Sequence, residues 1–122
     1  MIEIMIVILA LLQVKHWFID FVDQTEEEVK YKGVYGDWRG IKHSLKQSMG
    51  TFVVIASVTL LQHFPFALAL AIFDFIAHYH IDWTKMNFGN RDIRTPQFWN
   101  HLGLDQMAHQ LCYLFIAASV VL

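Results

Sequence analysis

Histidine and aspartate residues four positions apart recur in three segments of this sequence, and one pair from each segment, the third in reverse order, forms a candidate set. The six residues are His16, Asp20, His78, Asp82, Asp105 and His109. Residues four apart lie on one face of a helix, so each pair would present an imidazole and a carboxylate to the same neighbour. These groups bind divalent metal ions, which can activate water for hydrolysis. The pattern therefore predicts a metal site if helices bring the pairs together.

The composition is typical of a membrane protein. The chain has 122 residues, of which 56% are hydrophobic and 15% aromatic, whereas soluble domains are about 45–50% apolar. A formal net charge of -2 gives no reason to expect nucleic acid as a partner. Cys112 is the single cysteine, so the chain cannot form an internal disulfide.

Four apolar segments are each close to the roughly 20 residues needed to cross a bilayer. They cover residues 2–22, 41–64, 66–85 and 102–122. We predict a single all-α domain, residues 1–122, in which they form an antiparallel four-helix transmembrane bundle. Pro65 suits the first turn of the third helix and indicates a tight hairpin before it. A soluble bundle is the alternative, but residues 52–61 and 66–73 carry almost no charge.

The positive charges predict an orientation in the membrane. All nine Lys and Arg residues lie in or beside the two long connections, residues 23–40 and 86–100. By the positive-inside rule both connections are cytoplasmic, and both termini are on the non-cytoplasmic side of the inner membrane, which the chain crosses several times. The first connection is expected to be a loop at the membrane surface, with residues 26–28 solvated.

The reversed order of the third pair is informative because the fourth helix must run opposite to the first and third. Counting about 1.5 Å per residue from the non-cytoplasmic ends places His16, His78 and His109 roughly 20 Å deep. The same count places the three aspartates of the pairs in a second layer, roughly 26 Å deep. We therefore predict a layered site for one or two divalent ions, with zinc first and manganese, iron or nickel as alternatives. A hydrogen-bonded polar network without metal is the competing interpretation.

Other polar residues are candidates for supporting roles. Asp74, about one turn deeper than the histidine layer, could accept a hydrogen bond from His78 or relay protons. His43 begins the second helix and could close over the site or simply lie at the interface. Gln24 and Gln106 flank the carboxylate layer and could orient ligands or water.

The order of these motifs resembles an uncharacterised family of small bacterial and phage integral-membrane proteins, known as a domain of unknown function. The motifs are His-x-x-x-Asp-Phe-x-x-Gln at 16–24, a histidine at 43, His-x-x-Ile-Asp-x-x-Lys at 78–85 and Asp-Gln-x-x-His at 105–109. The resemblance covers nearly the whole chain. More loosely, the chain is similar to predicted membrane-bound metal-dependent hydrolases. Neither resemblance implies a known substrate.

The function that we predict is a metal-dependent hydrolase acting near the cytoplasmic leaflet. Asp20 or Asp105 could serve as the general base, and Asp74 is a further catalytic candidate. The expected partners are the lipid bilayer, a lipid-linked or membrane-peptide substrate, and a second copy of the chain as an open alternative. Two non-enzymatic functions also stay open: an ion or proton pathway, and an accessory or exclusion factor with a structural metal.

Overall fold

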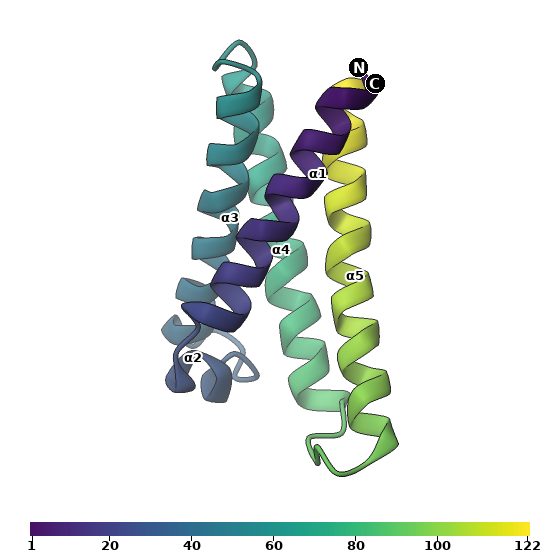
Figure 1. Ribbon diagram of the computed structural model, residues 1–122. Helices are drawn as coiled ribbons and strands as arrows, with labels where there is room; N and C mark the ends of the chain where they lie inside the picture. Colours follow the sequence, from purple (N-terminus) through teal and green to yellow (C-terminus); the bar gives the residue numbers. More distant parts are fainter.

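The computed structural model describes the whole chain, Met1 to Leu122, and consists of helices without strands, which confirms the all-α class. Four long helices alternate in direction and form a bundle (Figure 1). They are α1 (Ile2–Trp17), α3 (Trp38–Val58), α4 (Phe64–Phe88) and α5 (Pro96–Val121). Helix α3 packs most extensively against α4, and α1 and α5 complete the bundle by packing on each other and on these two.

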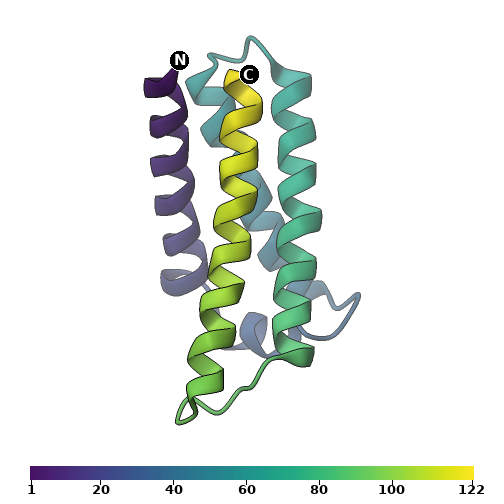
Figure 2. The same cartoon turned by 90° about the vertical axis from the view of Figure 1, so that its right-hand side faces the viewer.

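Both chain termini and the short turn between α3 and α4 lie at one end of the bundle, as Figure 1 and the rotated view in Figure 2 show. The two long connections lie at the opposite end, which we call the loop end. The two connections predicted to share one side of a membrane are therefore neighbours in space.

Helix α1 continues into a π-helical turn, η1 (Phe18–Val22), in place of the uninterrupted α-helix predicted for residues 2–22. The backbone N–H of Asp23 donates to the carbonyl of Phe18, at 2.8 Å, across five residues. A π-turn rotates the side chains that follow it relative to an α-helix, and such turns are frequent at functional sites. Asp20 lies in the middle of this turn.

A short helix, α2 (Glu26–Tyr31), lies in the segment predicted to be a loop. Thr25 begins it with a capping box: its hydroxyl accepts from the Glu28 backbone N–H, and the Glu28 carboxylate accepts from the Thr25 N–H. The prediction that residues 26–28 are solvated is wrong for Glu28, which is 1% exposed. Its carboxylate turns inward and pairs with Lys46 of α3, at 2.9 Å.

Helix α3 begins earlier and ends earlier than the predicted range of 41–64. Asp37 caps its start by accepting from the Arg39 N–H, and hydrogen bonds from the Arg39 side chain and backbone lower the pKa of Asp37 to about 2. The helix ends at Val58 because Leu60 and Leu61 adopt left-handed backbone conformations, with φ of 51° and 61°.

The other two helices are longer than predicted. Helix α4 starts at Phe64, with Pro65 in its first turn as expected, and extends to Phe88 instead of residue 85. Helix α5 starts at Pro96 instead of residue 102, because the Thr95 hydroxyl accepts from the Phe98 N–H and caps it. Residues 96–100, predicted to belong to the connection, are therefore the first residues of α5.

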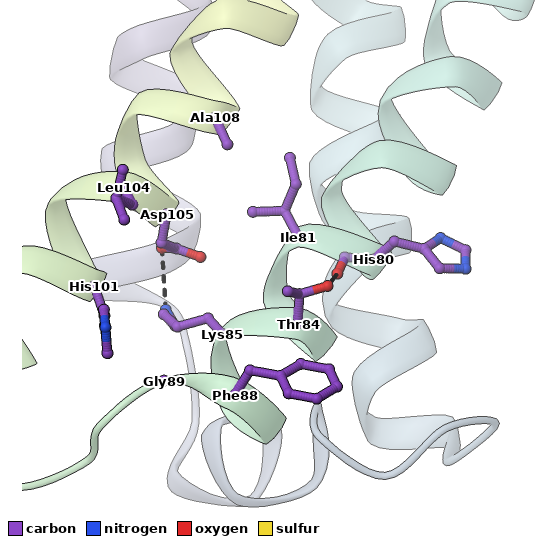
Figure 3. Close-up of a pocket in the computed structure, with 10 residues that line it drawn as sticks. All are labelled: His80, Ile81, Thr84, Lys85, Phe88, Gly89, His101, Leu104, Asp105 and Ala108. Carbon is purple, nitrogen blue, oxygen red and sulfur yellow. Dashed lines mark hydrogen bonds and ion pairs between the residues drawn. The ribbon is translucent and has the colours of Figure 1, made fainter.

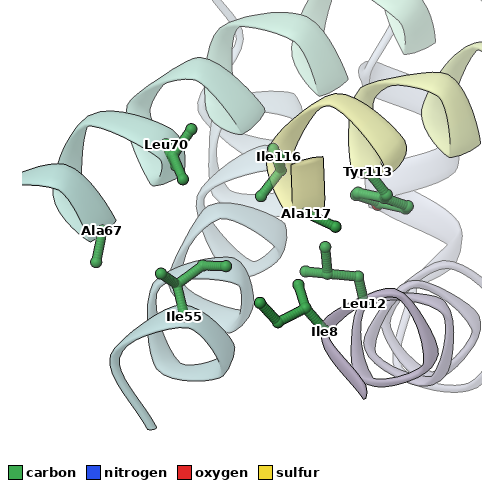
Figure 4. Packing of buried hydrophobic residues seen from close by; sticks show 8 residues of the cluster. All are labelled: Ile8, Leu12, Ile55, Ala67, Leu70, Tyr113, Ile116 and Ala117. Carbon is green, nitrogen blue, oxygen red and sulfur yellow. The ribbon is translucent and has the colours of Figure 1, made fainter. Parts of the chain in front are cut away.

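The buried residues fall into an apolar half and a polar half. Near the termini, eight side chains from the four long helices pack together (Figure 4): Ile8, Leu12, Ile55, Ala67, Leu70, Tyr113, Ile116 and Ala117. Toward the loop end most buried side chains are polar, and 14 of the 27 buried residues in the chain are polar or charged. Large apolar side chains such as Val7, Val53 and Phe115 are instead exposed on the outer faces.

Two stretches of helix are long and apolar enough to cross a membrane, Ile2–Val22 and Phe64–Phe88. Length and composition alone define this criterion, and a core helix of a soluble protein or a signal sequence can also meet it. The four predicted segments correspond to four long helices, but only two of these satisfy the criterion, so the transmembrane bundle stays a prediction.

Candidate metal centre

The six side chains predicted from their spacing come together inside the bundle, and the most exposed of them, Asp20, is only 6% exposed. His16, His78 and His109 form one group, in which one ring nitrogen of each residue lies within 4.8 Å of the others. A second group has the same limit and consists of Asp20, His78, Asp82 and His109. Because the groups share two histidines, the imidazole and carboxylate layers are in direct contact.

Asp82 is the central carboxylate. Its Oδ1 lies 3.3 Å from His109 Nε2, and its Oδ2 lies 3.3 Å from His78 Nε2 and 3.4 Å from His43 Nε2. Neither oxygen of Asp82 has a hydrogen bond of acceptable geometry, and neither has His109 Nε2. Buried polar atoms are normally hydrogen-bonded, so ligand-type atoms that converge without such bonds fit a site for a cation.

Of the two positions expected for His43, the structure shows the one at the site; the side chain does not lie at the membrane interface. Its side chain is fully buried, with Nε2 at 3.0 Å from Asp20 Oδ1 and 3.2 Å from His78 Nε2. The early start of α3 explains this position, since residue 43 then lies in the second turn of the helix. His43 is therefore a further candidate ligand.

His16 is held in a chain of hydrogen bonds that links Lys15 to Asp105. Lys15 Nζ donates to the Tyr113 hydroxyl, and that hydroxyl lies 2.8 Å from His16 Nδ1. On the other side of the ring, His16 Nε2 lies 3.0 Å from the amide oxygen of Gln106, whose amide nitrogen donates to Asp105. Because the lysine and the amide nitrogen can only donate, the chain requires a proton on Nε2 of His16.

Asp105 is the most peripheral member of the six. Its Oδ1 lies 3.6 Å from His109 Nε2, while its Oδ2 pairs with Lys85 at 3.1 Å. Both glutamines line the cleft at the loop end beside the carboxylates: Gln106 contacts Asp105, and Gln24 donates to the backbone carbonyl of Asp20. Gln24 also accepts from Lys32, at 2.9 Å.

Lysine side chains enter the site, although their sequence positions suggested only loops and loop edges. Lys32 is 4% exposed and lies 3.3 Å from Asp82. Burial disfavours the charged form of Lys32, but Asp82 and then Asp20 and Asp105 outweigh this effect and raise the pKa of Lys32 above its ordinary value. Lys32 is therefore a fixed positive charge beside the central carboxylate.

Glycines allow these lysines to reach the interior. A Cβ atom on Gly40 would lie 3.0 Å from the Lys32 Cα, and one on Gly50 would lie 2.6 Å from the Lys15 Cγ. Each glycine on α3 therefore gives room to a lysine from another segment. Glycines inside α3 are visible in the sequence, but they do not identify the lysines that approach them.

Asp74 lies farther from the loop end than the other carboxylates. It pairs with Lys15 at 3.1 Å and accepts a hydrogen bond from the Thr51 hydroxyl. The structure places it against these two side chains and not against His78, whose Nδ1 has no hydrogen-bond partner. The proton-relay role of Asp74 stays a prediction.

Two hollows give access to the region. A cleft of about 390 Å³ opens at the loop end, and its walls include Asp20, Lys32 and Gln106. A groove of about 400 Å³ lies between α4 and α5, where the Asp105–Lys85 ion pair forms part of its wall (Figure 3). The cleft brings solvent or a ligand as far as the carboxylate of Asp20.

Replacement of Lys32 tests the electrostatics of the site. Lys32→Met leaves Asp82 buried without its lysine, and we expect a loss of about 3–5 kcal/mol in the free energy of unfolding, as for a broken buried ion pair. Because the pKa of Lys32 is raised, its contribution is fully present below the ordinary lysine pKa and is lost only as pH rises through the raised value. Chemical unfolding in detergent measures the change. The control is the exposed Lys30→Met, and equal stability of the two variants would contradict the expected role of Lys32.

The chain was compared with protein-family models, with curated proteins and with solved structures, and none matches. The resemblance to a family of small integral-membrane proteins, which rests on the order of the motifs, stays a prediction. What the buried groups can do therefore follows from their own geometry and charge.

Proposed function

We propose that this chain is a multi-pass protein of the inner membrane and that all four long helices cross the bilayer. The distribution of side chains supports this proposal, because polar groups fill half of the interior while large apolar groups cover the outer faces. In water such an arrangement would expose an extensive apolar surface. In a bilayer the apolar outer faces would contact lipid, and the polar groups would face the interior of the bundle. The basic residues then make the loop end cytoplasmic.

We propose further that the polar half of the bundle binds a divalent metal ion. The observation that carries this proposal is the convergence of Asp20, His78, Asp82 and His109, whose ligand atoms lie within 4.8 Å of one another. The hydrogen-bonding needs of the Asp82 carboxylate and of His109 Nε2 are unmet, and a cation would satisfy both. Nitrogen and oxygen ligands without thiolate suit zinc, and also manganese, iron or nickel. The group of three histidines would hold a second ion only if His16 gave up its hydrogen bond to Tyr113 or to Gln106.

The function that this centre supports best is hydrolysis. A bound divalent ion lowers the pKa of a water ligand and polarises a carbonyl or phosphoryl oxygen. Asp20 lines the cleft and has no lysine partner; its Oδ1 accepts from the Gln47 amide, so Oδ2 is the oxygen that would accept a proton from water. Asp105 is less suited to this role, because Lys85 already holds one of its oxygens. A substrate reaching the cleft from the membrane would be a lipid-linked molecule or a membrane peptide.

An ion or proton pathway is less well supported. Toward the termini, the interior beyond Asp74 and Thr51 is the apolar cluster of eight residues described above. A pathway needs polar groups or water along its whole length. The polar groups therefore form a site that is closed toward the termini and is reached through the cleft at the loop end and the groove between α4 and α5.

An accessory factor with a structural metal is the alternative, and the dense pairing of lysines with carboxylates favours it.

Metal content tests the central part of the proposal. Purified in mild detergent without chelators, the wild-type protein is expected to contain about one or two transition-metal ions per chain by elemental analysis. Asp82→Asn removes the central ligand and is expected to lose most of this metal. Asp92→Asn, an exposed loop carboxylate paired with Arg94, is the control and should keep it. A wild-type protein without stoichiometric metal would contradict the proposal.

Asp20→Asn separates an enzyme from a structural metal site. With His78, Asp82 and His109 still in place, we expect this variant to fold and to retain metal. If Asp20 is the general base, hydrolysis should fall by about 100-fold or more. The assay is release of head group or phosphate from a panel of phospholipids and lipid-linked phosphates in proteoliposomes. Metal-loaded wild-type protein without turnover on any of them would favour the accessory-factor alternative.

A further inference from the structure

Two hollows meet beside the candidate metal centre. The cleft at the loop end and the groove between α4 and α5 share two lining residues, Lys85 and His101. The volumes, about 390 Å³ and 400 Å³, are each in the range of sites for small organic ligands. One ligand could therefore occupy both hollows if one end of it suited the lining of the cleft and the other end suited the lining of the groove.

The cleft is the cationic part. Lys32 and Lys85 line it, but each is paired with a buried carboxylate. Arg91 also lines it and has no carboxylate partner; its guanidinium contacts only the sulfur of Met86, at 3.4 Å. The other two arginines of the chain are each paired with an aspartate two positions away. The unpaired positive charge of Arg91 is thus available to an anion.

The groove is the apolar part (Figure 3). Ile81 of α4 faces Leu104 and Ala108 of α5 across it, and Phe88 also lines it. The small side chain of Ala108 leaves the space between the helices open at this level. Phe88 and Leu104 are both more than half exposed, so the groove opens on the side of the bundle. If the helices cross a bilayer, this side faces the lipid near the cytoplasmic surface.

We propose that the two hollows together bind a phospholipid with an anionic phosphate head group, which would be the substrate class of the metal centre. The phosphate lies in the cleft, where Arg91 binds it, and an acyl chain lies in the groove between α4 and α5. The head group then lies next to Asp20. This inference rests on the proposed membrane orientation, but binding of the lipid does not require the metal.

A third hollow provides a contrast. It has a volume of about 570 Å³, lies between α3 and α4, and is lined almost entirely by apolar residues such as Met49, Phe52 and Ile72. No lysine or arginine lines it. It could accept an acyl chain but offers no site for a phosphate, so it serves as the internal control for specific binding.

The test is photo-crosslinking of the full-length protein in nanodiscs of zwitterionic lipid. The probe is a phosphatidic acid with a diazirine in one acyl chain, and mass spectrometry maps the labelled residues. We expect labels within residues 80–89 and 101–108. Arg91→Gln should lower labelling about tenfold, as expected for the loss of a charge-assisted hydrogen bond. Ala108→Phe, which fills the groove, should lower it to a similar extent.

Matched controls keep the test specific. Arg94→Gln removes an arginine that is already paired with Asp92, and Ile72→Phe adds an aromatic ring at the third hollow; neither should change labelling. Unlabelled phosphatidic acid should compete with the probe, whereas inorganic phosphate and diacylglycerol should not.

Labels spread evenly over the four helices, or concentrated at the third hollow, would overturn the inference. Full competition by inorganic phosphate would also overturn it, since the site would then bind free phosphate. Metal content is measured on the same preparation. Lost labelling in a metal-loaded protein contradicts the lipid site alone, and missing metal with intact labelling contradicts the metal centre alone.

Discussion

Neutralisation of buried carboxylates is the constraint on which the rest of the structure depends, because an unpaired charge inside a bundle is strongly destabilising. Five carboxylates are buried, and four of them lie within ion-pair distance of a lysine: Glu28 with Lys46, Asp74 with Lys15, Asp82 with Lys32 and Asp105 with Lys85. The fifth, Asp20, meets the Gln47 amide and His43 instead. One negative charge is thus left for the imidazoles or for a bound cation, and it lies at the candidate metal centre.

The backbone is adapted to these charges at several places. The π-turn at the end of α1 carries Asp20, and the early start of α3 at the Asp37 cap brings His43 into the interior. Glycines on α3 give room to lysines from α1 and from the connection after α2. Two residues placed by these features, Asp20 and Lys32, also line the cleft at the loop end, whereas the apolar half near the termini holds the helices together.

The meeting of the three His/Asp pairs could be predicted because it depends only on helical periodicity and on the opposite direction of α5. The capping box at Thr25 is also present in the sequence, as Thr-x-x-Glu before α2, so this short helix could have been predicted as well. The burial of Lys15 and Lys32 could not be predicted in the same way. A lysine beside a loop is ordinarily solvated, and its entry depends on close approach to a glycine distant in the sequence. The burial of His43 could not be predicted either, because it depends on the residue at which α3 begins.

Anomalous diffraction from crystals of the protein purified without chelators tests the metal centre most directly. Data collected on both sides of the absorption edge of the metal locate an ion without reference to any activity. The account predicts a peak inside the bundle, enclosed by Asp20, His78, Asp82 and His109, with nitrogen and oxygen as its only protein ligands. An interior without a peak, in which Lys32 and the imidazoles alone balance the carboxylates, would contradict it.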